Sequence, residues 1–228
     1  MIFNQFFDEA SCTYTYLLSS GKGREALIID PVLEKTDEYI SCLKKLDLKL
    51  VKVIDTHIHA DHISGMKELH KQTDCANVMG EKSLSEVVNM KVKDNEKIKI
   101  ENIELISMYT PGHTDCSYSF LMKDRIFTGD TLLINGTGRT DFQNGNPIDQ
   151  YHSLFDRILK LPEKIFVYPA HDYKGNKVST IGQQKHTNPR LQVKSSNQYA
   201  ELMNNLKLDN PRMMDVAVPA NIKGKTLE

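Results

Sequence analysis

Histidine and aspartate side chains gather in four short segments of this chain. The densest segment spans residues 57–62 and follows the pattern His-x-His-x-Asp-His. Three further segments contribute one such side chain each, and the full set is His57, His59, Asp61, His62, His113, Asp130 and His171. Neutral imidazoles and carboxylates are ligands that Zn(II), Fe(II) and Mn(II) accept. The set therefore predicts a metal centre and disfavours a merely solvated surface cluster.

The residues before these segments are typical of β-strands. Residues 48–55 form an apolar run that leads directly into the first segment. In an extended segment His57 and His59 project to the same side, because side chains alternate along a strand. A turn into the following helix then brings Asp61 and His62 toward the same cavity. We therefore expect the ligands to lie at strand ends, where a rigid sheet fixes their positions.

The rest of the chain alternates strand patterns with a few amphipathic helices. Strands are predicted at residues 11–19, 25–30, 48–55, 97–108 with a turn at 101–102, 118–128 with a turn at 123–124, and 164–168. Helices are predicted at residues 36–46, after the His-rich segment, from Pro147 behind an Asn146 cap, and after a Ser195–Gln198 capping box. The last of these is the only clear helix expected after residue 190. This order predicts an α/β fold with much antiparallel sheet.

Length and composition limit the class of protein. A chain of 228 residues, 39% hydrophobic and 26% charged, is long enough for one globular domain with a full core. We interpret residues 1–228 as a single domain, with a core at about 1–190 and an extension at 191–228. The formal net charge of −1 provides no basic field for nucleic acid, and no apolar run approaches the ~18 residues of a membrane helix. We therefore expect neither nucleic acid nor a membrane as a partner.

The cysteines and the N-terminal residues indicate the compartment. Cys12, Cys42, Cys75 and Cys116 are scattered and form no Cys-x-x-Cys pair, which favours reduced thiols over a disulfide framework or a zinc ribbon. The first nine residues end in Asp-Glu, where a signal or transit peptide would carry positive charge. We therefore expect a cytoplasmic protein.

The order and spacing of the seven candidate ligands resemble those of the metallo-β-lactamase superfamily. The matching pieces are the His-x-His-x-Asp-His run, His113 within Pro-Gly-His-Thr, Asp130 within Thr-Gly-Asp-Thr, and His171. The resemblance extends over roughly residues 1–190. It implies an αββα sandwich with the metal at one edge between the sheets, followed here by a short C-terminal helical extension.

Within that superfamily, several segments resemble the persulfide dioxygenases related to the ethylmalonic encephalopathy protein. These segments are Ser11-Cys-Thr-Tyr-Thr-Tyr-Leu, Gly136-Thr-Gly-Arg-Thr-Asp-Phe-Gln143, Tyr168-Pro-Ala-His-Asp-Tyr173, Asn188-Pro-Arg-Leu191 and Val216-Ala-Val-Pro-Ala-Asn221. Together they cover nearly the whole chain. Glyoxalase II proteins match the ligand pattern as well, but they tend to carry a longer C-terminal helical region, so we favour the dioxygenase family.

This resemblance implies a non-haem iron oxidoreductase. One Fe(II) per chain would be held by His57, His113 and Asp130, and such a triad leaves coordination positions open for substrate and oxygen. The implied reaction oxidises glutathione persulfide with O2 and water to sulfite and glutathione, a step of sulfide detoxification. No catalytic residue is expected beyond the metal centre, and the resemblance suggests a homodimer.

The alternative is a hydroxyacylglutathione hydrolase of the glyoxalase II type. In such enzymes, positions matching His59, Asp61, His62 and His171 complete a dinuclear zinc site, with the residue matching Asp130 as the bridge. That architecture generates a metal-bound hydroxide for thioester cleavage. The ligands alone do not distinguish a site with one iron from a site with two zincs. In the dioxygenase interpretation the four extra residues orient the ligands and water. A metal-stabilised binding protein without turnover is a third, weaker interpretation.

Two residues are candidates for binding the substrate. Arg139 carries a planar guanidinium that matches a carboxylate of glutathione in a bidentate way, although a loop salt bridge is the plain alternative. Tyr173 matches a tyrosine of the family's substrate pocket, with simple packing as its alternative. Asn135 and Thr137 stand where some members of the family carry a basic residue and a cysteine.

Overall fold

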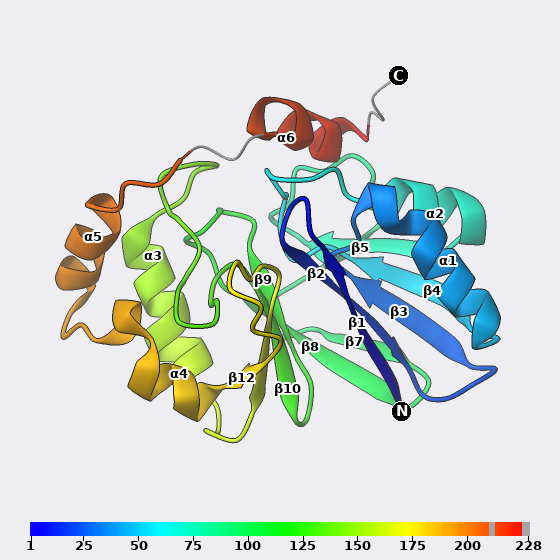
Figure 1. Cartoon of the computed structure of the whole chain (residues 1–228), viewed down its shortest axis with the longest axis horizontal. Coiled ribbons are helices and arrows are strands. Elements are labelled where there is room, and N and C mark those ends of the chain that lie inside the picture. Colours follow the sequence, from blue (N-terminus) through cyan, green and yellow to red (C-terminus); the bar gives the residue numbers. More distant parts are fainter. Residues whose placement is uncertain (210–212, 225–228) are drawn as a thin grey trace.

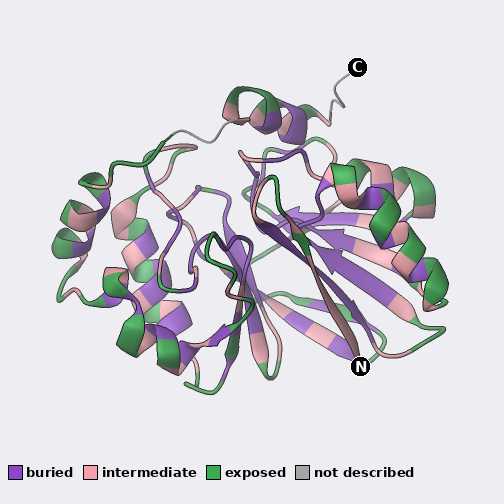
Figure 2. Ribbon diagram, in the orientation of Figure 1, coloured by how far each residue is buried: buried purple, intermediate pink, exposed green. Residues whose placement is uncertain are grey.

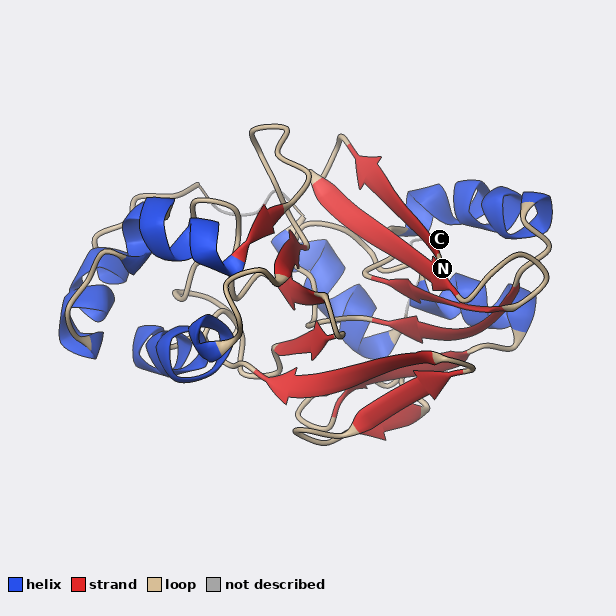
Figure 3. Cartoon of the chain, turned by 90° about the horizontal axis from the view of Figure 1, so that it is seen from below, coloured by secondary structure: helices blue, strands red, loops and turns tan. Residues whose placement is uncertain are grey.

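A computed structural model of the protein describes residues 1–209 and 213–224. Two six-stranded β-sheets lie face to face, and helices cover the outer face of each sheet (Figure 1). The view from below in Figure 3 shows the same strands between two groups of helices. The αββα sandwich expected from the sequence is therefore confirmed.

The first sheet has the order β1-β2-β3-β4-β5-β6, and the second has the order β12-β11-β10-β9-β8-β7. The strands are β1 (Ile2–Asp8), β2 (Thr13–Ser19), β3 (Glu25–Ile29), β4 (Lys49–Ile54), β5 (Ala76–Gly80), β6 (Met90–Val92), β7 (Lys97–Ile100), β8 (Ile103–Tyr109), β9 (Tyr118–Leu121), β10 (Arg125–Gly129), β11 (Phe166–Pro169) and β12 (Ser179–Thr180). The helices are α1 (Thr36–Lys45), α2 (Met66–Thr73), α3 (Pro147–His152), α4 (Ile181–Thr187), α5 (Ser196–Asn204) and α6 (Met214–Lys223). Short helical turns are η1 (Leu33–Lys35), η2 (Ser153–Arg157), η3 (Ile158–Lys160) and η4 (Pro189–Leu191).

Strand direction determines where the loops with polar side chains meet. Strands β1 to β3 pair antiparallel, whereas β3 to β6 pair parallel, with α1 and α2 as crossover helices. In the second sheet β10 pairs parallel with β11, and the remaining described pairs are antiparallel. Parallel neighbours end at the same edge of a sheet, so the residues that follow β10 and β11 lie side by side.

Three apolar cores hold the four layers together. Side chains on the inner faces of both sheets form the middle core, which includes Tyr16, Ile29 and Phe127. Leu17 and Ile28, one residue along the same strands, pack on the other face against α1 and α2, because strand side chains alternate. A third core joins the second sheet to α3, α4 and α5. Figure 2 shows the result: buried strands in the middle and helices that are exposed on their outer faces.

Most predicted elements lie within two residues of their expected bounds. Asn146 caps α3 as expected, since its Oδ1 accepts from the amides of Ile148 at 2.8 Å and Asp149 at 3.2 Å. The expectation of one clear helix after residue 190 is wrong, because α6 follows α5. Pro219 stands inside α6, and an interior proline is normally a sign that a helix ends. No helix in the described ranges is both long and apolar enough to cross a membrane.

Candidate metal centre

The seven candidate ligands lie at one edge of the two sheets, in the segments that follow strands. Four of them follow β4, His113 lies between β8 and β9, Asp130 follows β10, and His171 follows β11. The sheets are joined at this edge, because the amide of Tyr14 on β2 donates to the carbonyl of Ala170 at 2.7 Å. The structure brings all seven residues together in two adjacent groups.

The first group is His57, His113 and Asp130, here called the triad; one potential ligand atom of each lies within 4.8 Å of the others. Nδ1 of His113 donates to the carbonyl oxygen of Arg139 at 2.7 Å, because a carbonyl only accepts. In a neutral imidazole the lone pair then belongs to Nε2, which faces Oδ2 of Asp130 at 3.6 Å. Two electron-pair donors that face each other fit a cation, so the triad is suited to hold a metal.

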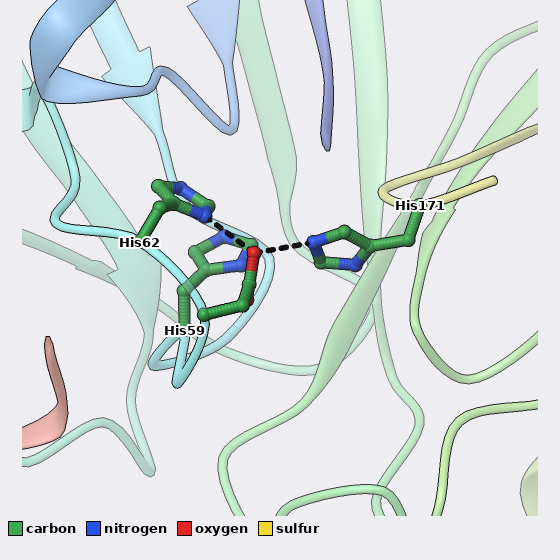
Figure 4. Close-up of side chains that lie close together, drawn as sticks. His59, His62 and His171 are labelled. Carbon is green, nitrogen blue, oxygen red and sulfur yellow. Dashed lines mark hydrogen bonds and ion pairs between the residues drawn. The ribbon is translucent and has the colours of Figure 1, made fainter. Parts of the chain in front are cut away.

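The second group is His59, Asp61, His62 and His171, here called the second cluster; its ligand atoms also lie within 4.8 Å of one another. Figure 4 shows the three imidazoles around the carboxylate, whose Oδ2 accepts from His62 Nδ1 at 2.9 Å and from His171 Nε2 at 2.8 Å. Nδ1 of His59 and Nε2 of His62 are buried and contact no hydrogen-bond partner among the described residues. An unpartnered buried polar atom costs about 1–3 kcal/mol, so these two histidine nitrogens beside the Asp61 carboxylate fit a cation.

Asp130 contacts both groups through its two oxygens. Oδ2 faces His113, whereas Oδ1 accepts a hydrogen bond from His171 Nδ1 at 2.7 Å. Burial opposes ionisation of this carboxyl, but the charges and hydrogen bonds of the neighbouring histidines, His171 first, hold its pKa below the ordinary value. Asp130 is therefore an anion that the triad and the second cluster share.

Burial also determines the protonation of the histidines that follow β4. Desolvation, reinforced by neighbouring imidazoles, lowers the pKa of His57 and that of His59 well below the ordinary value. The two rings lie close together, with centroids 4.2 Å apart. Neutral imidazole is the form that binds a metal. Both side chains are thus held in the state that a ligand requires.

Asp30, which follows β3, is a supporting residue that sequence reasoning missed. Its carboxylate accepts from the amide of Thr56 at 2.7 Å and from the Thr56 hydroxyl at 3.1 Å, and it contacts His59 Nε2 at 3.1 Å. The Thr56 hydroxyl in turn contacts His57 Nδ1 at 2.9 Å. Burial raises the pKa of Asp30 to about 6, and nearby His57 opposes that rise. This buried carboxylate thus orients one histidine of each group.

Thr13 at the start of β2 is a second supporting residue that was missed. Its hydroxyl lies within hydrogen-bond distance of Asp61 Oδ2 (3.2 Å), His62 Nδ1 (3.3 Å) and His171 Nε2 (3.0 Å). The side chain is fully buried. A threonine in a strand pattern carries no chemical signal of its own, and its role comes from the way the first sheet meets the second.

Asn221 of α6 ties the C-terminal part of the chain to the metal-site loop. Its Nδ2 donates to the carbonyls of His59 at 3.0 Å and His62 at 2.9 Å. Its Oδ1 accepts from the amide of Ser64 at 2.8 Å. Figure 1 shows α6 lying across the top of the sandwich, where this loop emerges from β4. The side chain thus fixes the backbone on both sides of Asp61.

Replacing Asn221 by alanine is expected to loosen this loop. The change removes three hydrogen bonds and leaves two loop carbonyls unpaired, which costs about 1–3 kcal/mol of unfolding free energy. Metal affinity should fall together with stability, measured by urea unfolding and by competition with a chelator. Val216→Ala, on an exposed part of the same helix, should change neither quantity. Unaltered metal affinity in Asn221→Ala would show that α6 does not hold the site.

Both groups border one cavity of about 510 Å³, a size typical of small-molecule sites. The triad, Asp61 and His171 lie along it, together with the substrate candidates Arg139 and Tyr173. Tyr173 is 69% exposed, and its ring stacks against His171 with centroids 6.2 Å apart. The remaining histidines, His70, His152 and His186, belong to neither group in the described part of the chain.

The Arg139 guanidinium already has protein partners. Nε and Nη2 each donate to a carboxylate oxygen of Asp141 at 2.7 Å, and Nη1 donates to the carbonyl of Asp209 at 2.6 Å. The group also lies 4.3 Å from the ring centroid of Phe142. The salt bridge to Asp141 therefore occupies the side of the Arg139 guanidinium that a substrate carboxylate would use.

Comparison with known proteins places this site in a family. The family model described as the metallo-beta-lactamase superfamily matches residues 12–87 and 83–171. The mitochondrial persulfide dioxygenase ETHE1 of Homo sapiens is 40% identical over 226 residues, 98% of this chain and 88% of that protein. The crystal structure of ETHE1 from Myxococcus xanthus superposes with a TM-score of 0.94 at 44% identity, over 97% of this chain and 98% of that one. A hydroxyacylglutathione hydrolase of Dictyostelium discoideum is 34% identical over 170 residues, 70% of this chain and 62% of that protein.

The fold and the family model define the class as a metallo-β-lactamase-type protein. Within that class, the relatives of the persulfide dioxygenase type match almost end to end, whereas the hydrolase match covers a shorter stretch at lower identity. The chain belongs to the persulfide dioxygenase family of the metallo-β-lactamase superfamily.

Proposed function

We propose that this protein oxidises glutathione persulfide with O2 and water to sulfite and glutathione, using one Fe(II) per chain. The observation that carries this proposal is a triad of two histidines and one aspartate that lines a ligand-sized cavity in a chain of this family. In the reaction the terminal sulfur of the persulfide is oxidised and O2 is reduced. The persulfide names of the relatives support the choice of substrate class.

Three residues would hold the metal, and their neighbours would orient them. His57, His113 and Asp130 would hold the metal, which when bound supplies the oxygen chemistry that side chains lack. The Arg139 carbonyl fixes the ring of His113 through Nδ1, and the imidazole of His171 fixes Asp130 through Oδ1. These contacts orient the ligand atoms of His113 and Asp130. We assign no general acid or base beyond this centre.

The cavity walls are proposed to bind the glutathione part of the substrate. Glutathione carries two carboxylates, and Arg139, Lys174 and Arg190 line the cavity as cations. Tyr173 stands at the exposed edge of the cavity, where its ring offers a flat surface for the peptide. Arg139 and Tyr173 stay our candidates for contact with glutathione because both line the cavity, but a carboxylate could bind Arg139 only by displacing Asp141.

His62→Ala is expected to separate one metal from two. In the mononuclear interpretation His62 is not a ligand but contacts Asp61 and Thr13, so the variant should retain most of its iron. In a dinuclear zinc enzyme the same change would remove a ligand and lower the zinc content toward one per chain. Metal per chain, measured by elemental analysis after dialysis, distinguishes the two. Complete metal loss in His62→Ala would contradict the assignment of the triad.

Metal analysis combined with oxygen uptake tests the proposal itself. We expect close to one iron per chain and O2 consumption that depends on added glutathione persulfide. The second candidate, a dinuclear zinc hydrolase, is favoured by one observation, the complete set of second-cluster ligands. Two zincs per chain and rapid S-lactoylglutathione hydrolysis without oxygen uptake would establish that candidate instead.

Domain organisation and location complete the proposal. A single domain over residues 1–228 is supported by α6, which packs on the first sheet's core through Val218 and Ile222 instead of standing apart. A cytoplasmic location is supported by four cysteines that are all unpaired. A homodimer rests on the family resemblance, and light scattering of the purified protein tests it.

A further inference from the structure

Three polar side chains are buried where α3 and α5 meet the loop at residues 136–139. They are Thr137, Gln150 and Tyr199, and each is at most 2% exposed. Apolar side chains surround them, since Tyr199 belongs to the third core and the Thr137 hydroxyl contacts the sulfur of Met203. Burying polar groups among apolar ones costs free energy unless each finds a hydrogen-bond partner, and apolar side chains of the same shape would pack as well. The buried polar group therefore indicates a role beyond packing.

The hydrogen bonds of these three side chains lead to the backbone of Gly138. Gln150 Nε2 donates to the Gly138 carbonyl at 3.1 Å. A carbonyl only accepts, so the amide nitrogen must face it, and Oε1 of Gln150 then faces the Tyr199 hydroxyl, which donates to it at 2.8 Å. The same hydroxyl lies 3.0 Å from Oγ1 of Thr137. Tyr199 thus fixes the amide of Gln150, and Gln150 fixes the Gly138 carbonyl.

Gln150 contacts both segments of the chain that pack around His113. A Cβ on Gly112, the residue before His113, would lie 2.3 Å from the backbone nitrogen and Cα of Gln150. A Cβ on Gly138 would lie 2.7 Å from Nδ1 of His113. Both glycines are therefore in direct contact with what they face, without room for a side chain. The backbone of Gln150 limits the position of the first segment, and its amide holds the second.

The loop that Gln150 holds also reaches two residues of the triad through the backbone. The Gly138 amide donates to the carbonyl of Asp130 at 2.6 Å. The carbonyl of the next residue, Arg139, accepts from Nδ1 of His113 at 2.7 Å and so leaves the lone pair of that imidazole on Nε2. A shift of this loop would therefore move His113 and Asp130 together.

We propose that Gln150, with its amide fixed by Tyr199, is a positioning residue for His113 and Asp130. It acts through the Gly138 carbonyl and contacts neither the metal nor the substrate. The described residues that line the cavity include neither Gln150 nor Tyr199. The assignment rests on the proposed function, because it takes His113 and Asp130 as ligands of the iron. It makes α5 a support of the metal centre.

Competition with a ferrous chelator under anaerobic conditions, together with thermal unfolding of the iron-loaded enzyme, tests the proposal. Gln150→Leu removes the donor to the Gly138 carbonyl and the acceptor of the Tyr199 proton. Its iron affinity should fall about 10- to 100-fold, the range found for residues that orient ligands. Its unfolding temperature should fall too, because two buried polar groups lose their partner. At saturating iron, kcat should fall while the KM for glutathione persulfide stays nearly unchanged.

Gln150→Leu combined with Tyr199→Phe separates positioning from folding. The second change removes the hydroxyl that Gln150→Leu leaves unpaired, so the double variant should recover part of the lost unfolding temperature. It does not restore a donor to the Gly138 carbonyl, so its iron affinity should stay as low as that of Gln150→Leu. Gln72→Leu, a matched change at an exposed position of α2, should leave every one of these quantities at the wild-type value.

Two results would overturn the proposal. If iron affinity recovers in the double variant in step with the unfolding temperature, the buried side chains only support the fold. If Gln150→Leu keeps the wild-type iron affinity, the loop does not depend on Gln150. A wild-type enzyme that holds iron yet consumes no O2 with the persulfide would refute the proposed function, and the iron affinities of the variants would still decide the role of Gln150.

Discussion

Replacing Asp130 by alanine is expected to abolish both iron retention and persulfide-dependent oxygen uptake. The change removes one of the three residues of the proposed triad, and it also removes the acceptor that orients His171. Mutation of residues that merely orient ligands costs roughly 10- to 100-fold in affinity or activity, so loss of a ligand should exceed that range. Iron per chain and O2 consumption measure the two effects.

Asp124→Ala is the matched control for this prediction. Asp124 is an aspartate in the turn before β10, exposed and paired with Arg125, and it lies outside both ligand groups. The control variant should keep wild-type iron content and activity. Thermal unfolding of both variants shows whether the fold is preserved. An Asp130→Ala enzyme that retained its iron and turnover would require a different triad.

Gly138→Ala is expected to cause the second largest loss, although it adds only a methyl group. A Cβ at this position would lie 2.7 Å from His113 Nδ1 and closer still to the carbonyl oxygen of Asp130. These neighbours are the ring of His113, a proposed ligand, and the backbone of Asp130, so neither can shift without moving the triad. A displacement of about 1 Å at a reactive centre costs on the order of 100-fold in rate. Turnover and iron content should therefore both fall.

Gly136, two residues earlier in the same loop, provides a control with the same glycine-to-alanine change. A Cβ at Gly136 would meet its nearest neighbour, Cβ of Leu133, at 3.8 Å, which is ordinary contact. Gly136→Ala should therefore retain iron and activity close to wild type. Equal activity of the two alanine variants would mean that the loop moves freely and that its close approach to the triad is unimportant.

The residues of the two groups could be predicted from the sequence to lie together, and the residues that support them could not. Each candidate ligand is a histidine or aspartate in a short motif after a strand, so residue type and spacing were sufficient to find it. Asn221 contacts the loop from 159 residues away, and such a contact exists only once α6 is folded onto the sheet. Thr13 likewise depends on how the two sheets meet. Asp30 is the exception, because an acidic residue that ends an apolar strand repeats the pattern that identified Asp130.

The other features that were not predicted from the sequence were missed for physical reasons as well. Four strands were not predicted. The three-residue β6 and the two-residue β12 are too short for any periodicity, whereas β1 (IFNQFFD) and β5 (ANVMG) lack a regular alternation of apolar and polar residues. A loop salt bridge of Arg139 was considered only as an alternative, and Asp141 was not named as its partner, since two opposite charges close together in a loop do not by themselves predict a pair. The number of metals stays open in the sequence because the same seven ligands serve either count.

The contact between Asn221 and the metal-site loop has a consequence for the order of events during synthesis. The ribosome completes the His59–His62 loop long before Asn221, which is made 159 residues after His62. Until α6 leaves the exit tunnel, the loop carbonyls have no Asn221 amide to bind them. Until α6 has been made and has folded, the nascent chain therefore carries these histidines on a loop that lacks the Asn221 contacts. Iron loading is expected to follow the folding of α6 and to be weaker in chains stalled before α6.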